Sequence, residues 1–180
     1  MVYVFLANGF EELEALSPID VLRRAGVETV TVGVGGKEIT AAHGVRFTAD
    51  ITEDQIKLGD AVEMIVLPGG MPGTNNLEAS VSVQSAIDFC AANDRYVAAI
   101  CAAPKILGAK GLLDGRNAIC FPGFEGDLRG ASISQDHVVC DGRFVTAKGA
   151  GVALEFALKL AALLTSDDKA AALAKSLQCR

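Results

Sequence analysis

The stretch that decides the fold is Val97-Ala98-Ala99-Ile100-Cys101-Ala102-Ala103-Pro104. Its apolar half, residues 97–100, is too short for a helix and is typical of a strand that is buried on both faces. Small alanines leave room for a sharp backbone turn after it. Pro104 suits a first helical turn, because its φ is fixed and it has no N–H to pair. The pattern places Cys101 between the carboxyl end of a strand and the amino end of a helix.

That position makes Cys101 a candidate nucleophile. In an open α/β sheet, ligands bind in the crevice at the carboxyl ends of the strands. The partial positive charge of a helix amino terminus favours a thiolate, so a sulfur on such a turn resembles the serine of a nucleophile elbow. The alternative is structural, since a free cysteine usually behaves as a small buried hydrophobe. This stretch alone does not decide between the two.

Strands and helices alternate through the rest of the chain. Further strands are expected at Val2–Ala7, at Glu28–Val34, at Met64–Leu67, and on both sides of the hairpin turn Asp141-Gly142. A small outer hairpin is expected between Lys37 and Asp50. Helices are expected from about Glu11 to Arg24, from Glu78 to Asn93, from Ala150 to Leu164 and from Asp167 to Leu177. This alternation predicts a single three-layer α/β domain over residues 1–180.

Two details of the first helix are also predicted. Asn8 precedes Glu11 by three residues, which is the spacing of a capping box that opens a helix. Pro18 lies within the segment and should bend the helix or start a second one.

Composition excludes several classes of function. The formal charge is -6, with 51% hydrophobic and 21% charged residues, so nucleic acid is not an expected partner. No run approaches the length of a membrane span, and residues 2–7 read as a strand rather than a signal peptide. The five cysteines are widely and irregularly spaced, which argues against a disulfide framework or a structural metal site. We expect a cytoplasmic protein without a bound metal.

Glycines follow two of the predicted strands. Gly69 and Gly70 come after Val66-Leu67-Pro68, where they would let backbone N–H groups approach a ligand, or would simply form a tight turn. Gly33, Gly35 and Gly36 suggest a dinucleotide fingerprint, but they follow the second strand and no long helix opens after them. The dinucleotide interpretation is therefore rejected.

Four segments together resemble one family. They are Gly9-Phe10-Glu11-Glu12-Leu13-Glu14-Ala15, Val66-Leu67-Pro68-Gly69-Gly70, Ala98-Ala99-Ile100-Cys101-Ala102-Ala103-Pro104, and Lys148-Gly149-Ala150-Gly151 before Glu155-Phe156-Ala157-Leu158. With these the chain resembles the ThiJ/PfpI family, also called the DJ-one superfamily, over essentially all its length. It is most similar to the branch of the ThiJ/YajL-like and parkinsonism-associated proteins. The cysteine elbow and the Pro-Gly-Gly motif are specific only in combination.

The resemblance implies a flavodoxin-like sandwich with a mostly parallel sheet, like the class I glutamine amidotransferases, and a homodimer. It implies that Cys101 is the reactive thiol, that Glu14 is its carboxyl partner, and that Gly69, Gly70 and Ala102 form an oxyanion and substrate-binding pocket. A carboxyl beside a thiolate should stay protonated, and its hydrogen bond should lower the pKa of the thiol. The structural alternative for Glu14 is a solvated acid in the first helical turn.

The chain departs from the family in its histidines. Ala102 stands where a Cys-His pair would have its histidine, and Phe121 precedes Pro122 where some relatives have a histidine. Of the two histidines in the chain, His43 is a possible pocket residue, as is Phe121, and His137 is expected to be exposed in the hairpin. Without a placed histidine, a protease-like triad is not expected.

Three functions remain open. The first is an enzyme of the glyoxalase III or deglycase type, which needs no cofactor and acts on glyoxals or glyoxal adducts in carbonyl or oxidative stress. The second is a redox-sensing protein or holdase chaperone that uses oxidation of Cys101 and has no dedicated substrate. The third is a small-molecule binding module that retains the pocket. A role in thiamine synthesis, which an older family label suggests, is set aside because no nucleotide-binding motif is present.

Overall fold

A seven-stranded sheet forms the centre of the molecule. The computed structural model describes residues 1–179. The strand order is β10-β11-β7-β6-β1-β2-β5, and every neighbouring pair is parallel except β10 and β11. The strands are β1 (Val2–Ala7), β2 (Thr29–Val34), β5 (Ile51–Thr52), β6 (Met64–Leu67), β7 (Tyr96–Ile100), β10 (Val138–Asp141) and β11 (Phe144–Ala147). The predicted fold class is confirmed.

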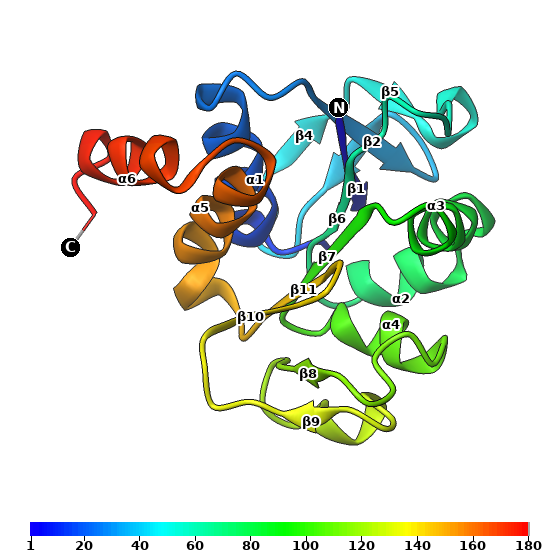
Figure 1. The fold of residues 1–180 in the computed structure, drawn as a ribbon. Coiled ribbons are helices and arrows are strands. Elements are labelled where there is room, and N and C mark those ends of the chain that lie inside the picture. Colours follow the sequence, from blue (N-terminus) through cyan, green and yellow to red (C-terminus); the bar gives the residue numbers. More distant parts are fainter. Residues whose placement is uncertain (180) are drawn as a thin grey trace.

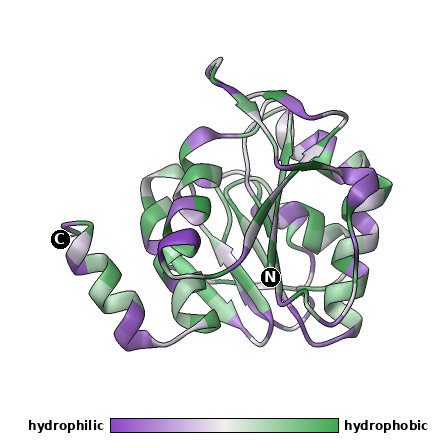
Figure 2. Cartoon of the chain, turned by 90° about the horizontal axis from the view of Figure 1, so that it is seen from above, coloured by the Kyte–Doolittle hydropathy of each residue, from purple (hydrophilic) through white to green (hydrophobic). Residues whose placement is uncertain are grey.

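Helices cover both faces of this sheet (Figure 1). On one side α1 (Glu12–Arg24) packs against α5 (Ala153–Leu164), and α6 (Asp167–Ser176) packs in turn on α5. The other side carries α2 (Gly73–Ala79), α3 (Val81–Ala92) and α4 (Pro104–Ala109). Each face buries its own apolar cluster, and Figure 2 shows hydrophobic residues along the strands between the helices. None of the helices in residues 1–179 is both long and apolar enough to cross a membrane.

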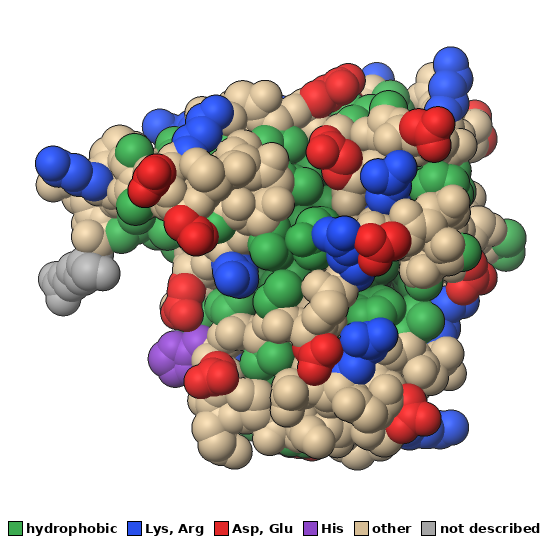
Figure 3. All heavy atoms as spheres, in the orientation of Figure 1, with side chains coloured by type: hydrophobic (Ala, Val, Ile, Leu, Met, Phe, Trp, Pro, Cys, Tyr) green, Lys and Arg blue, Asp and Glu red, His purple; other side chains and the backbone are tan. Residues whose placement is uncertain are grey.

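Shorter strands and 3-10 turns lie outside the central sheet. The predicted outer hairpin is present as β3 (Glu38–Thr40) and β4 (Arg46–Thr48), which pair antiparallel. A second two-stranded sheet joins β8 (Asn117–Ala118) and β9 (Ser132–Ile133). Single 3-10 turns occur at η1 (Glu53–Gln55), η2 (Glu125–Asp127) and η3 (Ala150–Val152). On the face seen in Figure 3, acidic and basic side chains are interspersed.

Two local predictions were wrong, and for Pro18 one of the two predicted alternatives was wrong. Helix α1 is capped by Glu11, whose side chain accepts from the Glu14 N–H, while Asn8 instead accepts from the Thr40 N–H at 2.8 Å. Pro18 lies inside α1 without dividing it into two helices. The segment expected to be one helix over residues 78–93 belongs to α2 and α3, because Ser80 is extended and caps α3 through the Val83 N–H.

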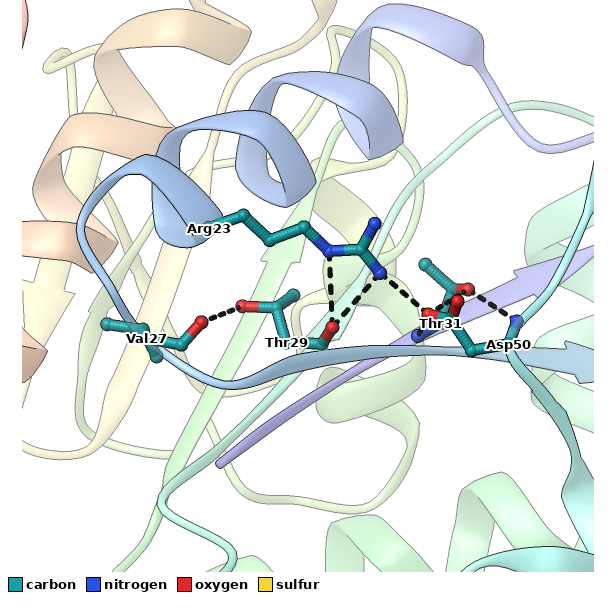
Figure 4. A network of polar contacts seen from close by, with 5 residues as sticks. All are labelled: Arg23, Val27, Thr29, Thr31 and Asp50. Carbon is teal, nitrogen blue, oxygen red and sulfur yellow. Dashed lines mark hydrogen bonds and ion pairs between the residues drawn. The ribbon is translucent and has the colours of Figure 1, made fainter.

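A polar network ties α1 to β2 and to the loop before β5 (Figure 4). One oxygen of Asp50 accepts from the Thr31 N–H at 2.9 Å, from its hydroxyl at 2.8 Å and from Arg23 at 2.7 Å. Arg23 also donates to the Thr29 carbonyl at 3.1 Å. Asp50 thereby links α1 and the loop before β5 to strand β2, the neighbour of the edge strand β5.

Strand register brings distant segments together at the carboxyl edge of the sheet. Leu67 of β6 is paired with Ala99 of β7, so the residues that follow these two strands emerge side by side. Ala147 of β11 is paired with Ile100 of β7, which places residues 148 and 149 next to the turn at residue 101. The candidate site is built at this edge.

Candidate active site

Cys101 forms a sharp turn between β7 and α4. Its φ of +65° lies in the left-handed region, which residues other than glycine seldom adopt. Its N–H donates to Ala147 O at 2.9 Å, and its carbonyl accepts from the Phe121 N–H at 2.8 Å. These bonds hold a strained residue in place, and the side chain is only half-buried. The predicted elbow is present, and its cysteine is not an enclosed core residue.

Glu14 lies in the first turns of α1 and points into the protein. It is fully buried, and its Oε2 accepts from the Gly69 N–H at 2.9 Å. Its backbone N–H donates to the capping carboxylate of Glu11 at 2.9 Å. The other carboxyl oxygen, Oε1, is buried and has no hydrogen-bond partner among the described residues. Glu14 is therefore not the solvated acid of the structural alternative.

Gly69 is the point where the loop after β6, helix α1 and the cysteine turn meet. A Cβ atom at this position would lie 2.6 Å from Glu14 Oε2 and 2.7 Å from Cys101 Cβ. Such contacts are far inside the van der Waals limit, so only glycine fits between the carboxyl and the cysteine. The loop is thus more than a tight turn, because its missing side chain lets the two groups approach.

Two backbone amides act on the sulfur. Burial raises the pKa of the Cys101 thiol, and the backbone N–H groups of Ala102 and Gly70 act against this rise by favouring the charged sulfur. Gly70 has a φ of +88°, which aims its backbone in a direction that other residues rarely adopt. The N–H of Gly69 is instead engaged by Glu14. Gly70 and Ala102 are therefore the amides that can reach an oxyanion, while Gly69 positions the carboxyl.

The carboxyl of Glu14 titrates near neutrality. Burial, which disfavours its charged form, raises the pKa of Glu14 from 4.5 to about 7, and the nearby charge of Glu11 adds to this effect. Hydrogen bonds from Cys101 and from the Gly69 N–H act in the opposite direction. A carboxyl with a pKa close to the working pH can both give and take a proton.

The thiol pKa of Cys101 is raised, whereas a lowered thiol pKa was expected from a hydrogen bond donated by a protonated Glu14. Burial raises the pKa of the Cys101 thiol to about 12, and the negative charge of Glu14 acts in the same direction. The charge contribution vanishes when Glu14 is protonated, since a neutral carboxyl no longer repels the sulfur. The titrations of Glu14 and Cys101 are therefore coupled, and the first negative charge of the pair resides mainly on Glu14. The partial positive charge at the amino end of the short helix α4 does not offset the effect of burial, which raises the pKa of the Cys101 thiol.

An apolar groove lies beside the thiol, and we call it the Phe121 groove. Its volume is about 340 Å³, and it is lined by Phe121, Pro122, His137, Lys148, Gly149, Ala150, Gly151 and Val152. A Cβ atom at Gly149 would lie 3.2 Å from the Phe121 ring and 4.0 Å from Cys101 Sγ. Phe121, which was predicted as a possible pocket residue, therefore lies close to Cys101.

His43 lies on the rim, away from the Phe121 groove. Its ring is largely exposed, and its Nδ1 pairs with Glu12 Oε2 at 2.8 Å. The hydrogen bond to Glu12 raises the pKa of His43. The structure does not place this histidine among the groove residues.

His137 is the groove residue that sequence reasoning missed. It precedes β10, and its carbonyl accepts from the Lys148 N–H at 3.0 Å, so the hairpin brings it to the groove. Its Nδ1 lies 3.6 Å from Glu155 Oε2. The signal was available, because the Asp141-Gly142 turn fixes a register in which Val138 faces Ala147 and residue 137 faces residue 148.

Two other places bear on cofactors. Ligand atoms of Glu11, Glu12 and His43 lie within 4.8 Å of one another and form a possible metal-ligand set, although Glu12 and His43 already pair with each other.

The glycines after β2 do not offer a free phosphate site. The Gly35 N–H donates to Glu53 Oε1 at 3.0 Å. A carboxylate thus occupies the amide that a bound phosphate would need, which argues against a dinucleotide site.

The chain is similar to known proteins over most of its length. The sequence model described as the DJ-1/PfpI family matches residues 1–163. The chain is 34% identical over 177 residues to "Protein dj-1beta" of Drosophila melanogaster, covering 97% of this chain and 94% of that protein. It is 30% identical to the "Glutathione-independent glyoxalase DJR-1.2" of Caenorhabditis elegans, covering 93% of this chain and 89% of that one.

Solved structures show the same fold. The crystal structure of Drosophila melanogaster DJ-1beta superposes with a TM-score of 0.94 at 34% identity, covering 99% of this chain and 97% of that chain. "Toxoplasma gondii DJ-1, oxidized" superposes with a TM-score of 0.91 at 33% identity, with the same coverage of 99% and 97%.

Proposed function

The chain belongs to the DJ-1/PfpI family, and we propose that it is a cofactor-independent enzyme of the glyoxalase III or deglycase type. Its substrates would be glyoxals or glyoxal adducts, and its role would be protection against carbonyl or oxidative stress. The observation that carries this proposal is the buried carboxyl of Glu14 beside the half-buried thiol of Cys101, across Gly69. The glyoxalase name of the Caenorhabditis elegans relative supports the same reaction class.

The first step in this proposal is attack by sulfur. The thiolate of Cys101 adds to the aldehyde carbon of methylglyoxal, and the aldehyde oxygen takes the proton of the Glu14 carboxyl to give a hemithioacetal and an ionised Glu14. The N–H groups of Gly70 and Ala102, which already face the sulfur, would stabilise the negative charge that forms on this oxygen. A donor of this kind contributes about 3 to 4 kcal/mol to transition-state stabilisation.

The second step moves one proton between the two substrate carbons. Glu14 removes the proton from the former aldehyde carbon, and an enediolate forms with its negative charge on the former ketone oxygen. Glu14 then returns the proton to the former ketone carbon while the hydroxyl proton moves to the former ketone oxygen, which leaves a thioester of the hydroxy acid. The pKa of Glu14, raised to about 7, suits both directions of transfer. Water then hydrolyses the thioester, which releases lactate and restores the thiol.

The test is lactate formation from methylglyoxal, without added cofactor, by wild type and by Cys101→Ser and Glu14→Gln. We expect no detectable turnover with Cys101→Ser and at least a roughly 100-fold loss with Glu14→Gln. Cys140→Ser and Glu28→Gln are matched controls, since both residues are exposed and lie outside the site. Wild-type levels of lactate from Cys101→Ser would refute the proposal. A glyoxal-modified amine, assayed in the same way, tests the deglycase activity.

A redox-sensing role is the second candidate. Cys101 is half-buried, whereas Cys90 and Cys120 are enclosed in the core, so peroxide would reach Cys101 more readily than these two thiols. Selective oxidation of Cys101 at low peroxide, together with oxidation-dependent protection of a client from aggregation and negligible methylglyoxal turnover, would favour this role. Peptide mass spectrometry after a peroxide titration measures it.

We also propose that the protein is a homodimer and acts in the cytoplasm. Leu13 and Leu16 of α1 and Leu154 of α5 are large apolar side chains exposed on two helices that pack together. A second copy would cover them. Sedimentation should give a dimer that Leu13→Glu weakens.

All five cysteines are free, which fits a reducing compartment such as the cytoplasm.

A further inference from the structure

We propose that this site is selective for α-oxoaldehydes whose ketone carbon carries a bulky apolar substituent, such as an aryl group, and that the Phe121 groove binds this substituent. The inference rests on the proposed function and extends it to the part of the substrate that does not react. It assigns a specificity role to Phe121 and to the glycine-rich turn η3.

Gly149 lies both in the lining of the groove and beside the thiol of Cys101. Gly149 lines the groove, and a Cβ atom there would lie 4.0 Å from Cys101 Sγ. The Phe121 N–H donates to the Cys101 carbonyl at 2.8 Å, so the aromatic residue is fixed relative to the elbow. A substrate bonded to the sulfur therefore has the Phe121 ring and the main chain of Gly149 beside it.

The lining of the groove suits an apolar group. Of its residues only His137 and Lys148 carry a charge-bearing side chain, and His137 already lies 3.6 Å from the Glu155 carboxylate. Phe121 is 47% exposed, and an apolar group bound in the groove would remove part of its ring from water.

The size of the groove exceeds what small glyoxals need. A cavity of about 340 Å³ lies within the range of small-molecule sites, and a methyl substituent would leave most of it filled with water. A phenyl substituent would displace that water and pack on the Phe121 ring. Apolar pockets discriminate between substrates by about tenfold or more for each group that they bury.

Gly151 offers a clean way to fill the groove. It lines the groove, its φ is not in the left-handed region, and a Cβ atom there would meet nothing within 4 Å. Gly59 has the same open surroundings but lies in the loop before β6, outside the groove. Gly151→Leu and Gly59→Leu therefore make the same chemical change, one at a residue that lines the groove and one at a residue that does not.

The experiment compares kcat/KM for phenylglyoxal, read as mandelate, with kcat/KM for methylglyoxal, read as lactate. In both reactions the aldehyde carbon is oxidised to a carboxylate, the ketone carbon is reduced to an alcohol, and one water is consumed. The ratio of the two values is compared between variants, so the intrinsic reactivity of each aldehyde cancels. We expect Gly151→Leu to lower this ratio at least about tenfold, Phe121→Ala to lower it as well, and Gly59→Leu to keep the wild-type ratio.

The outcomes separate the two proposals. If wild type converts neither aldehyde, the proposed function fails. If wild type converts methylglyoxal and the ratio is the same in Gly151→Leu, the groove does not bind the substituent and this inference is overturned. If wild type converts methylglyoxal but rejects phenylglyoxal, the groove is closed to substrate, as it would be under a second copy of the chain, and the inference is again overturned.

Discussion

Glu14 and Cys101 approach each other across the bare backbone of Gly69. A Cβ atom at Gly69 would lie 2.6 Å from Glu14 Oε2 and 2.7 Å from Cys101 Cβ. The N–H of the same residue holds the carboxyl at 2.9 Å. One glycine thus sets both the distance and the orientation of the two groups, and the consequences can be measured.

Gly69→Ala should abolish methylglyoxal turnover and destabilise the protein by about 1–3 kcal/mol, because the new methyl group displaces Glu14 or Cys101. Gly59→Ala is the control, since a Cβ atom there meets nothing within 4 Å. Urea unfolding at low temperature separates loss of fold from loss of activity. A folded Gly69→Ala protein with wild-type turnover would show that the close approach is not needed.

Turnover should rise with pH through about 7 and then level off. The pair of Glu14 and Cys101 loses its first proton near the raised pKa of Glu14, about 7. Below that pH both groups are protonated and no thiolate exists. Above it the pair carries one charge, and the fraction of this charge on sulfur does not change with pH until the second proton leaves. The pH profile of kcat/KM measures this, and a flat profile from pH 5 to 9 would contradict it.

Glu14→Gln should stabilise the protein at pH 8. The pKa of Glu14 is raised from 4.5 to about 7 in the folded state, so ionisation disfavours folding progressively as the pH rises between these values. Glutamine stays neutral, and its amide oxygen can still accept from the Gly69 N–H. The expected gain at pH 8 is up to about 3 kcal/mol, and it should vanish at pH 4.

Urea titrations of wild type and Glu14→Gln at pH 4 and pH 8 measure this difference. Glu28→Gln, a change on the exposed surface, should give no gain at either pH. An equal effect of Glu14→Gln at both pH values would mean that the carboxyl is not the source of the gain.

Asp50→Asn should cost about 1–2 kcal/mol at pH 7, because the carboxylate accepts two hydrogen bonds from Thr31 and one from Arg23. Partial burial raises the pKa of Asp50, but the bonds from Thr31 and Arg23 outweigh it and lower the pKa below 3.8. The stabilisation is therefore present above pH 3.8 and is lost as the pH falls through the lower folded value. Chemical unfolding of wild type and Asp50→Asn at pH 7 and pH 2.5 measures the loss of stability. An equal loss at both pH values would show that the charge of Asp50 is not its source.

Much of the architecture followed from short-range pattern. The buried apolar runs predicted strands β1, β2, β6 and β7, because a strand covered on both faces has no polar side to show. The Asp141-Gly142 turn predicted the β10–β11 hairpin. Helix boundaries were less predictable. Asn8 and Glu11 both have side chains that can cap a helix. In the structure Asn8 accepts from the Thr40 N–H of a distant segment, and Glu11 caps α1.

For the site, the sequence by itself determined which groups are candidates for the chemistry. The pattern of an apolar run, Cys101, small residues and Pro104 predicted an elbow, and the resemblance to the family named Glu14 and the glycines after β6. These features are local, since they depend on backbone conformation and on residue type within a few positions.

Only the tertiary structure decided how these groups interact. It buried Glu14, engaged Gly69 with its carboxyl, and brought His137 and Phe121 to one groove. It also raised the thiol pKa of Cys101, chiefly through burial, where a lowered thiol pKa was expected. The physical reason is that burial and charge–charge interactions depend on distances between segments far apart in the chain, and the packing of the sheet and its helices sets those distances.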